Sequence, residues 1–163
     1  MTAEPYERLA LIGLGLIGSS IAWAARRAGA AGEIVGYART AETRETAARL
    51  GFCDRVAESA AEAVRGADLV ILCVPVGAFA AVAAEIGPEL APGATVSDAG
   101  SVKGRVIEQL APRLPEGVHL VPAHPLAGTE HSGPESGFAE LFEGRWCILT
   151  PLEGGDRAAT DRL

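Results

Sequence analysis

Hydrophobic residues along the chain follow two patterns, short continuous runs and positions spaced three or four residues apart. The continuous runs predict strands at residues 9–12, 33–38, 67–74, 94–98, 118–122 and 146–150. The wider spacing predicts helices at 21–28, 41–50, 59–64, 77–86 and 102–110, a helical turn at 138–142, and a helix that begins at Asp156. Strands that alternate with helices in this way indicate an α/β protein with a mainly parallel, doubly wound sheet and helices on both faces.

Three glycines, Gly13, Gly15 and Gly18, interrupt the first hydrophobic run in the order GxGxxG. Gly13 allows a tight turn, Gly15 has no side chain to keep a ligand from the backbone, and Gly18 lets the next helix pack closely on its strand. Free N–H groups in this turn, which includes Leu16 and Ile17, suit a pyrophosphate. The same spacing also occurs in ordinary structural turns. The strand before the motif and the helix after it favour a dinucleotide site of the Rossmann type.

Ligands of open parallel sheets bind beyond the carboxyl ends of the strands, so the residues after each predicted strand form the candidate site. These residues are Gly13 to Gly18, Arg39, Thr40, Val74, Pro75, Ala99 to Ser101, Ala123 and His124. Cys73, next to Val74, is also predicted to bind the cofactor. From Ala123 to Gly137 the chain is rich in Gly, Pro, Ser and Thr, and it is predicted to be a long loop of the kind that carries function.

The end of the predicted second strand bears on the choice between NAD and NADP. Enzymes specific for NAD usually carry Asp or Glu here to bind the ribose hydroxyls, whereas this chain has Ala38. Arg39 and Thr40 follow, with Arg44 one helical turn on, and a guanidinium group binds a 2′-phosphate through bidentate hydrogen bonds. We therefore expect NADP, or use of both cofactors. The alternative is that Arg39 stacks over the adenine ring and discriminates weakly.

His124 is the residue best suited to act as a general base. A neutral imidazole can accept the proton of a hydroxyl group as hydride leaves the same carbon, and His124 lies at the carboxyl end of a predicted strand. The alternative is a loop histidine without a catalytic part. His119 is predicted to be structural, and His131 could face solvent or substrate. Ser101 and Asp98 also have structural alternatives, Ser101 as a helix N-cap and Asp98 as an acceptor that holds its loop.

Composition and charge narrow the classes of partner. The 163 residues suffice for one domain with its own core. The 21 acidic and 14 scattered basic side chains give a net charge of −7, which argues against a nucleic-acid partner. No apolar run approaches the roughly 18 residues of a membrane span, and the N-terminus lacks a signal-peptide pattern. We therefore expect no membrane association and a cytoplasmic location.

The cysteines Cys53, Cys73 and Cys147 are odd in number and far apart, which fits neither a disulfide framework nor a metal site. All three are predicted to be buried, as free cysteines commonly are. Lys103 is the only lysine, which we attribute to the composition of a chain rich in Ala and Gly.

Several motifs together resemble one family, the prephenate and arogenate (cyclohexadienyl) dehydrogenases of tyrosine biosynthesis, and specifically its N-terminal nucleotide-binding domain. The stretches that carry this resemblance are Gly13–Ser20, Val70–Pro75, Ser97–Lys103, Trp146–Pro151 and above all His124–Gly133. The likeness extends over nearly the whole chain, and the stretches that contain Ser101 and His124 are far more specific than the glycines.

The resemblance implies oxidative decarboxylation with NADP or NAD and without a metal. In this family, His124 would draw the proton from the ring hydroxyl of prephenate or arogenate as hydride passes from C4 to the nicotinamide. Ser101 would hold the same hydroxyl, and Thr129 and Glu130 would border the substrate and its entrance. Loss of carbon dioxide would then give 4-hydroxyphenylpyruvate from prephenate, or tyrosine from arogenate.

The resemblance also implies a domain organisation. Residues 1–152 would form the dinucleotide-binding domain, and residues 153–163 would begin a linker or helix toward a helical C-terminal dimerisation domain absent from this sequence. We expect cofactor binding and little turnover from this chain alone, and a homodimer in the full-length protein. Two alternatives remain, another NADP-dependent dehydrogenase of the βαβ type and a non-catalytic dinucleotide-binding module.

Overall fold

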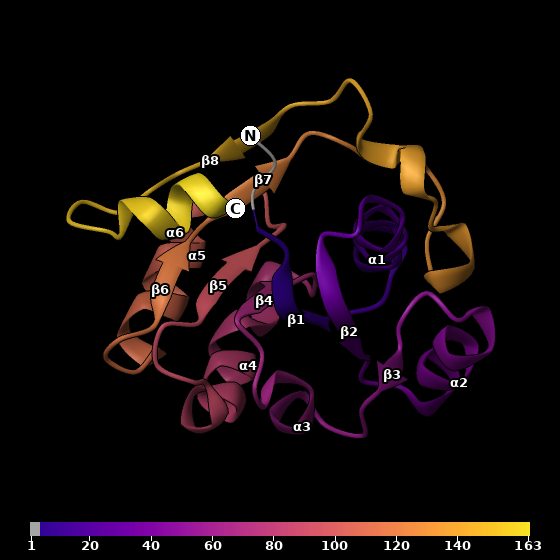
Figure 1. Cartoon of the computed structure of the whole chain (residues 1–163), viewed down its shortest axis with the longest axis horizontal. Coiled ribbons are helices and arrows are strands. Elements are labelled where there is room, and N and C mark those ends of the chain that lie inside the picture. The colour runs from indigo at the N-terminus through magenta and orange to yellow at the C-terminus, as the bar shows by residue number, and fades with distance from the viewer. Residues whose placement is uncertain (1–3) are drawn as a thin grey trace.

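The computed structural model describes residues 4–163 as a six-stranded sheet flanked by helices, with a two-stranded sheet beside it (Figure 1). All neighbours in the main sheet are parallel, in the order β3-β2-β1-β4-β5-β6. The strands are β1 (Tyr6–Ile12), β2 (Ala31–Tyr37), β3 (Arg55–Val56), β4 (Leu69–Leu72), β5 (Thr95–Asp98) and β6 (His119–Val121). This is the strand order of the Rossmann fold, so the predicted fold class is confirmed.

Helices and short 3-10 turns connect these strands. The helices are α1 (Leu16–Ala28), α2 (Ala41–Leu50), α3 (Ala60–Val64), α4 (Phe79–Ile86), α5 (Lys103–Leu110) and α6 (Arg157–Arg162). The 3-10 turns are η1 (Val76–Ala78), η2 (Gly87–Glu89), η3 (Ala111–Arg113), η4 (Pro134–Ser136) and η5 (Ala139–Phe142). Within residues 4–163, no helix has the length and apolar character that crossing a membrane requires.

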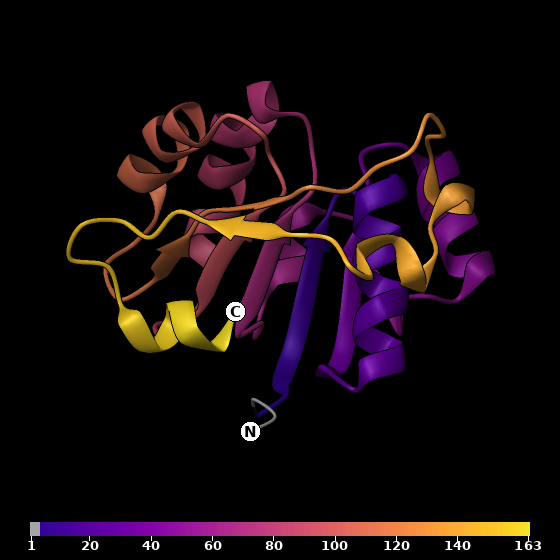
Figure 2. The same ribbon diagram turned by 90° about the horizontal axis from the view of Figure 1, so that it is seen from above.

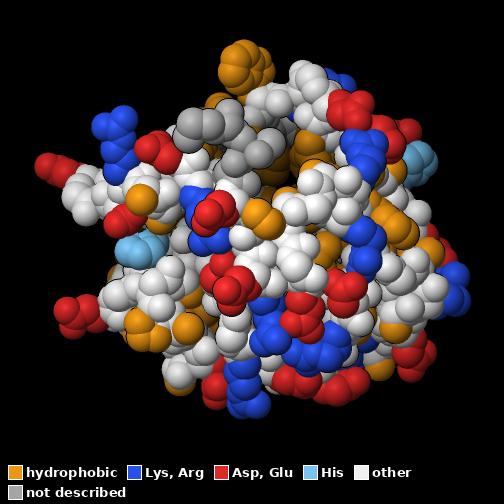
Figure 3. Space-filling view, in the orientation of Figure 1, with side chains coloured by type: hydrophobic (Ala, Val, Ile, Leu, Met, Phe, Trp, Pro, Cys, Tyr) orange, Lys and Arg blue, Asp and Glu red, His pale blue; other side chains and the backbone are white. Residues whose placement is uncertain are grey.

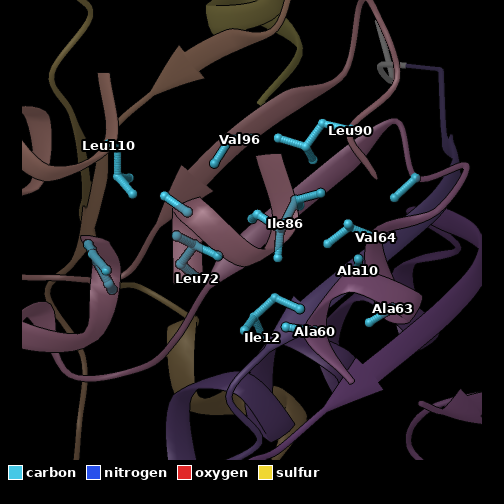
Figure 4. Close-up of a cluster of buried hydrophobic side chains, with 14 of the residues drawn as sticks. Ala10, Ile12, Ala60, Ala63, Val64, Leu72, Ile86, Leu90, Val96 and Leu110 are labelled. Carbon is cyan, nitrogen blue, oxygen red and sulfur yellow. The ribbon is translucent and has the colours of Figure 1, made fainter. Parts of the chain in front are cut away.

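Alternate side chains of the strands build two hydrophobic cores, one on each face of the sheet. Ala10 and Ile12 of β1 pack with α3, α4 and α5, in the cluster shown in Figure 4. Leu9 and Leu11, their neighbours in β1, pack instead with α1 and α2 on the other face. Strands buried on both faces explain why β1 and β4 read as continuous apolar runs.

The predictions for residues 123–137 and 146–150 are partly wrong. Ala123–Pro125 forms a strand, β7, at the start of the predicted long loop, and it pairs antiparallel with β8 (Cys147–Leu149). The run at 146–150 therefore does not join the parallel sheet. Parallel pairing needs a crossover, usually through a helix, and residues 126–146 contain only η4 and η5. In Figure 2 the β7–β8 ribbon crosses the strands of the main sheet.

The segment between β7 and β8 is anchored on α1, beside which it lies in Figure 2. Arg27 of α1 pairs with Glu140 and Glu143, at 2.6 Å in each case. The backbone N–H of Phe138 donates to Ser20 Oγ at 3.1 Å. These contacts connect the segment between β7 and β8 to α1, the helix that follows the glycine turn.

The predicted helix at Asp156 is confirmed as α6. The Asp156 carboxylate accepts a hydrogen bond from the backbone N–H of Ala159 at 2.7 Å and so caps the helix. Arg162 pairs with Asp68 at 3.1 Å, and its guanidinium lies 4.0 Å from the centre of the Tyr6 ring. The last helix thus packs back against the start of β1.

Candidate functional site

The three glycines of the first turn have three different surroundings. Gly13 has a φ of +102°, and a Cβ there would lie 2.6 Å from the carbonyl oxygen of Cys73. A Cβ on Gly18 would lie 2.0 Å from the carbonyl oxygen of Gly13. A Cβ on Gly15 would meet no protein atom within 4 Å. Protein packing therefore requires glycine at 13 and 18, whereas at position 15 its absent side chain leaves space open to a ligand.

The N-terminus of α1 is open to an anion. Gly15 is the N-cap residue, no side chain caps the helix, and its first turn contains no acidic residue. The first N–H groups of a helix have no partner within it, and here they belong to Leu16, Ile17 and Gly18. With the open space at Gly15, they fit the pyrophosphate of a dinucleotide.

A cleft of about 730 Å³ lies beside this turn, within the size range of ligand pockets. Its predicted lining residues are Gly13, Gly15, Arg39, Thr40, Cys73, Val74 and Pro75. The structure thus brings together the ends of β1, β2 and β4. Leu16, Ile17 and Gly18 lie in α1 beside the cleft and are not among its lining residues. Sequence reasoning missed Tyr37, Gly77 and Glu85, although Tyr37 and Gly77 adjoin the predicted strand ends.

The two arginines near the end of β2 differ in what their side chains bind. Arg44 donates to the carbonyl oxygens of Ala38 and Arg39, at 2.9 and 3.1 Å, and pairs with Glu58 at 3.1 Å. Arg39 is exposed, and its guanidinium makes no hydrogen bond or ion pair with another of residues 4–163. The Thr40 hydroxyl caps α2 by accepting from the Thr43 N–H at 3.3 Å. Arg39 is therefore the cation at this end of the cleft with no protein partner in the described chain.

The cysteines are in three different environments. Cys53 is buried, Cys73 is half-buried against the cleft and Cys147 is exposed, so the prediction of burial is wrong for Cys147. Its strand, β8, lies outside the main sheet, where one face remains open. Burial raises the pKa of the Cys53 and Cys73 thiols to about 12, with smaller contributions from the charges of Asp54 and Asp98, so both are neutral near pH 7.

Asp98, at the end of β5, is the centre of a buried polar cluster. Its side chain is 0% exposed and pairs with Lys103. The Asp98 carboxylate accepts from the backbone N–H of Gly100 at 2.7 Å and from that of Ala123 at 3.1 Å. Asp98 does hold its loop, as predicted, and it also reaches β7. Sequence reasoning missed Lys103, although a single lysine in an arginine-rich chain was the available signal.

The predicted catalytic residues lie next to this cluster. His124 is half-buried in β7, and its partner across the ribbon is Ile148. Ser101 is exposed and does not cap α5, because Val102 occupies the N-cap position without a capping hydrogen bond. Neither residue lines the 730 Å³ cleft. Thr129 and Glu130 are exposed on the loop after β7, where the N–H of His131 donates to the Thr129 hydroxyl at 3.1 Å.

A second hollow, of about 380 Å³ and with mostly apolar walls, lies against one face of the β7–β8 ribbon (Figure 3). Ala123 and Pro125 of β7 and Cys147 and Leu149 of β8 line it. Because side chains alternate along a strand, His124 points to the opposite face of the ribbon. The ribbon therefore separates His124 from this hollow.

Comparisons with known proteins agree with this architecture. Residues 21–163 match the family model described as the nucleotide-binding domain of prephenate dehydrogenase. The cyclohexadienyl dehydrogenase of Zymomonas mobilis is 46% identical over 146 residues, which cover 90% of this chain and 50% of that protein. The prephenate dehydrogenase of Bacillus subtilis is 32% identical over 158 residues, or 96% of this chain and 43% of that protein.

A solved structure gives the same picture. The prephenate dehydrogenase of A. aeolicus, in complex with hydroxyphenyl propionate and NAD+, superposes with a TM-score of 0.86 at 35% sequence identity. The match covers 95% of this chain and 54% of that one. The chain thus spans about half the length of the curated relatives it matches. These matches show that the chain belongs to the prephenate dehydrogenase family and contains its nucleotide-binding domain.

Proposed function

We propose that this chain is the cofactor-binding and general-base domain of an enzyme that oxidatively decarboxylates prephenate or arogenate with NADP or NAD. The observation that carries the proposal is the arrangement at the carboxyl-terminal edge of the sheet. The open glycine turn and its cleft lie at the ends of β1, β2 and β4. The Asp98 cluster, which binds the segments that carry Ser101 and His124, follows the adjacent strand β5. The A. aeolicus relative, solved with hydroxyphenyl propionate and NAD+, supports this choice of ligands.

The chain's own residues suggest how the cofactor would be held. Gly13, Gly15 and the first turn of α1 would bind the pyrophosphate, and Cys73, Val74 and Pro75 would form the wall of the cleft. Arg39, with Thr40 beside it, would bind the 2′-phosphate of NADP, which makes NADP the favoured cofactor. When bound, the nicotinamide supplies the acceptor for the hydride.

The remaining chemistry is proton removal and orientation. In the proposed mechanism, the imidazole of His124 accepts the proton of the substrate's ring hydroxyl, and Ser101 holds that hydroxyl toward it. Loss of the ring carboxylate as carbon dioxide creates an aromatic ring and gives 4-hydroxyphenylpyruvate or tyrosine. Because aromatisation drives this step, the protein contributes chiefly by alignment. Thr129 and Glu130 would border the substrate entrance.

Replacing His124 by Asn tests this function. In a full-length context, we expect the His124→Asn variant to lose turnover of prephenate or arogenate by about 10²–10⁴-fold, because Asn cannot accept the proton. The affinity for the cofactor, measured by calorimetric titration, should change little. The matched control is His119→Asn, which alters a histidine of β6 that does not line the cleft. Unchanged turnover in His124→Asn would refute the proposed base.

Replacing Arg39 by Ala tests the cofactor preference. Arg39→Ala removes the charge-assisted hydrogen bonds to a 2′-phosphate, so the Kd for NADP should rise about tenfold or more while that for NAD stays nearly constant. Calorimetric titration of this chain with each cofactor measures both constants. Arg49→Ala, which removes an exposed arginine paired with Glu135, is the control. An equal loss for both cofactors would contradict the phosphate assignment.

The organisation of the whole protein is part of the same proposal. We place the dinucleotide-binding domain at residues 1–152 and the start of a connection to a helical dimerisation domain at residues 153–163. The small-molecule substrate, the homodimer and the cytoplasmic location follow from this assignment as expectations.

A further inference from the structure

The ion pair between Asp98 and Lys103 is nearly removed from solvent. The exposed fraction of the side chain is 0% for Asp98 and 14% for Lys103. Taking two charges out of water is costly, and a buried ion pair often contributes no more stability than apolar residues of similar volume. The specific contacts of this pair therefore matter more than its contribution to stability.

The pair binds the backbone on both sides of the candidate site. One Asp98 carboxylate oxygen accepts from the N–H of Ala123, and Lys103 donates to the carbonyl oxygen of the same residue. The other carboxylate oxygen accepts from the N–H of Gly100. Ala123 directly precedes His124, and Gly100 directly precedes Ser101. A single carboxylate thus connects the two backbone segments that carry these residues.

Within residues 4–163, Asp98 and Lys103 make the only side-chain hydrogen bonds to β7 from the rest of the main-sheet unit. The ladder partner of β7 is β8, and the remaining hydrogen bonds that the described chain shows for Ala123 go to Asp98 and Lys103. In the Gly100 segment, an added Cβ would lie 2.9 Å from the Asp98 carboxylate. The backbone of Gly100 therefore lies directly against this carboxylate. These hydrogen bonds therefore help to set where the Ala123 peptide lies relative to the Ser101 loop.

We propose that Asp98 and Lys103 are positioning residues that fix His124 relative to Ser101 by holding the Ala123 peptide and the Gly100 turn on one carboxylate. The part of the inference that concerns catalysis by His124 and Ser101 rests on the proposed function. The geometric part concerns only where His124 lies, and it can be measured without turnover.

The chain offers a direct measurement, because its three histidines give three separate side-chain signals in NMR spectra of labelled protein. Lys103→Met removes the donor to Ala123. We expect the His124 imidazole signal to shift or broaden, while those of His119 and His131 stay in place. Arg105→Met is the matched control, since Arg105 lies on the same helix and pairs with exposed Glu108. An unchanged His124 signal in folded Lys103→Met would overturn the proposal.

A double variant separates positioning from stability. Lys103→Met alone leaves an uncompensated buried carboxylate and can unfold the chain. Asp98→Asn combined with Lys103→Met removes both charges, so its melting temperature should exceed that of Lys103→Met. The double variant still lacks the Lys103 ammonium that donates to the Ala123 carbonyl, so the His124 signal should remain displaced. A wild-type His124 signal in the double variant would show that the pair is only structural.

Kinetics in a full-length context give the catalytic readout. A misplacement near 1 Å can cost about 10²-fold in rate, so kcat of the double variant should fall by about that factor while the Kd for NADP or NAD is retained. A wild-type kcat beside a displaced His124 signal would refute the catalytic part of the inference. If the wild-type enzyme turned over neither prephenate nor arogenate, the proposed function would fail, and the NMR result would still decide the positioning.

Discussion

At the scale of single residues, the glycine turn shows how one motif contains unequal constraints. Packing against Cys73 and against the turn itself excludes side chains at Gly13 and Gly18, whereas Gly15 faces no protein atom within 4 Å. The GxGxxG spacing predicts that all three positions need glycine, although the neighbour that excludes a side chain at Gly13, Cys73, lies outside the motif.

This contrast leads to a paired prediction. Gly18→Ala places a methyl group against the Gly13 carbonyl, so the free energy of unfolding should fall by about 1–3 kcal/mol. Gly15→Ala should change stability by less than about 1 kcal/mol, since only the helix N-cap is altered. Its Kd for NADP and NAD should rise about tenfold or more. Thermal unfolding and calorimetric titration measure the two effects, and equal destabilisation by both substitutions would contradict this interpretation.

The Asp98–Lys103 pair could not be predicted in the same way. Its function depends on Ala123, more than 20 residues further along the chain, and on a strand that local sequence does not reveal. Asp98 was predicted as a loop acceptor, because Asp commonly binds nearby backbone. The contact with β7 exists only once the ribbon has formed.

At the scale of elements, local signals predicted most of the fold. The bounds of α2 are those expected from Thr40, which caps its start, and Gly51, whose φ of +75° ends it. The parallel strands followed from their continuous apolar runs, except β3, which has only two residues. A strand was predicted at β8, but its antiparallel pairing with β7 was not, because that pairing spans a segment without helical crossover. Strand β7 was missed, and it contains Pro125.

Asp54 joins β2, α1 and the start of β3, and it leads to a prediction about pH. Its carboxylate accepts from the Ile34 N–H at 2.7 Å and pairs with Arg26 at 2.7 Å. The Ile34 hydrogen bond, followed by Arg26, lowers the pKa of Asp54. A lowered folded-state pKa stabilises the fold above about pH 4, and this stabilisation is lost as the pH falls through the folded-state value.

We therefore expect Asp54→Asn to melt below the wild type at pH 7, with the difference shrinking as the pH falls below about 4. Melting curves recorded across this pH range measure the difference. Asp161→Asn, at an exposed pair with Arg157, is the control and should show little difference at any pH. A gap that persists unchanged into acid would mean that the charge of Asp54 is not what stabilises this junction.

At the scale of the whole molecule, the two sides of the ribbon differ in chemistry. His124 lies on one side, and the other side lines the apolar hollow of about 380 Å³. Trp146, just before β8, is 80% exposed, and Ile148 is 49% exposed. The hydrophobic run predicts only that these residues lie in a strand. Only the placement of the ribbon outside the main sheet explains their exposure.

The burial of Lys103 also has a consequence for covalent labelling. Because the 163 residues contain no second lysine, reagents directed at primary amines find a single side-chain target in this sequence, an ammonium already bound to Asp98. In the folded chain this ammonium should therefore react much more slowly than the amine of an exposed lysine. Labelling of Lys103 would instead report that the Asp98 pair has opened.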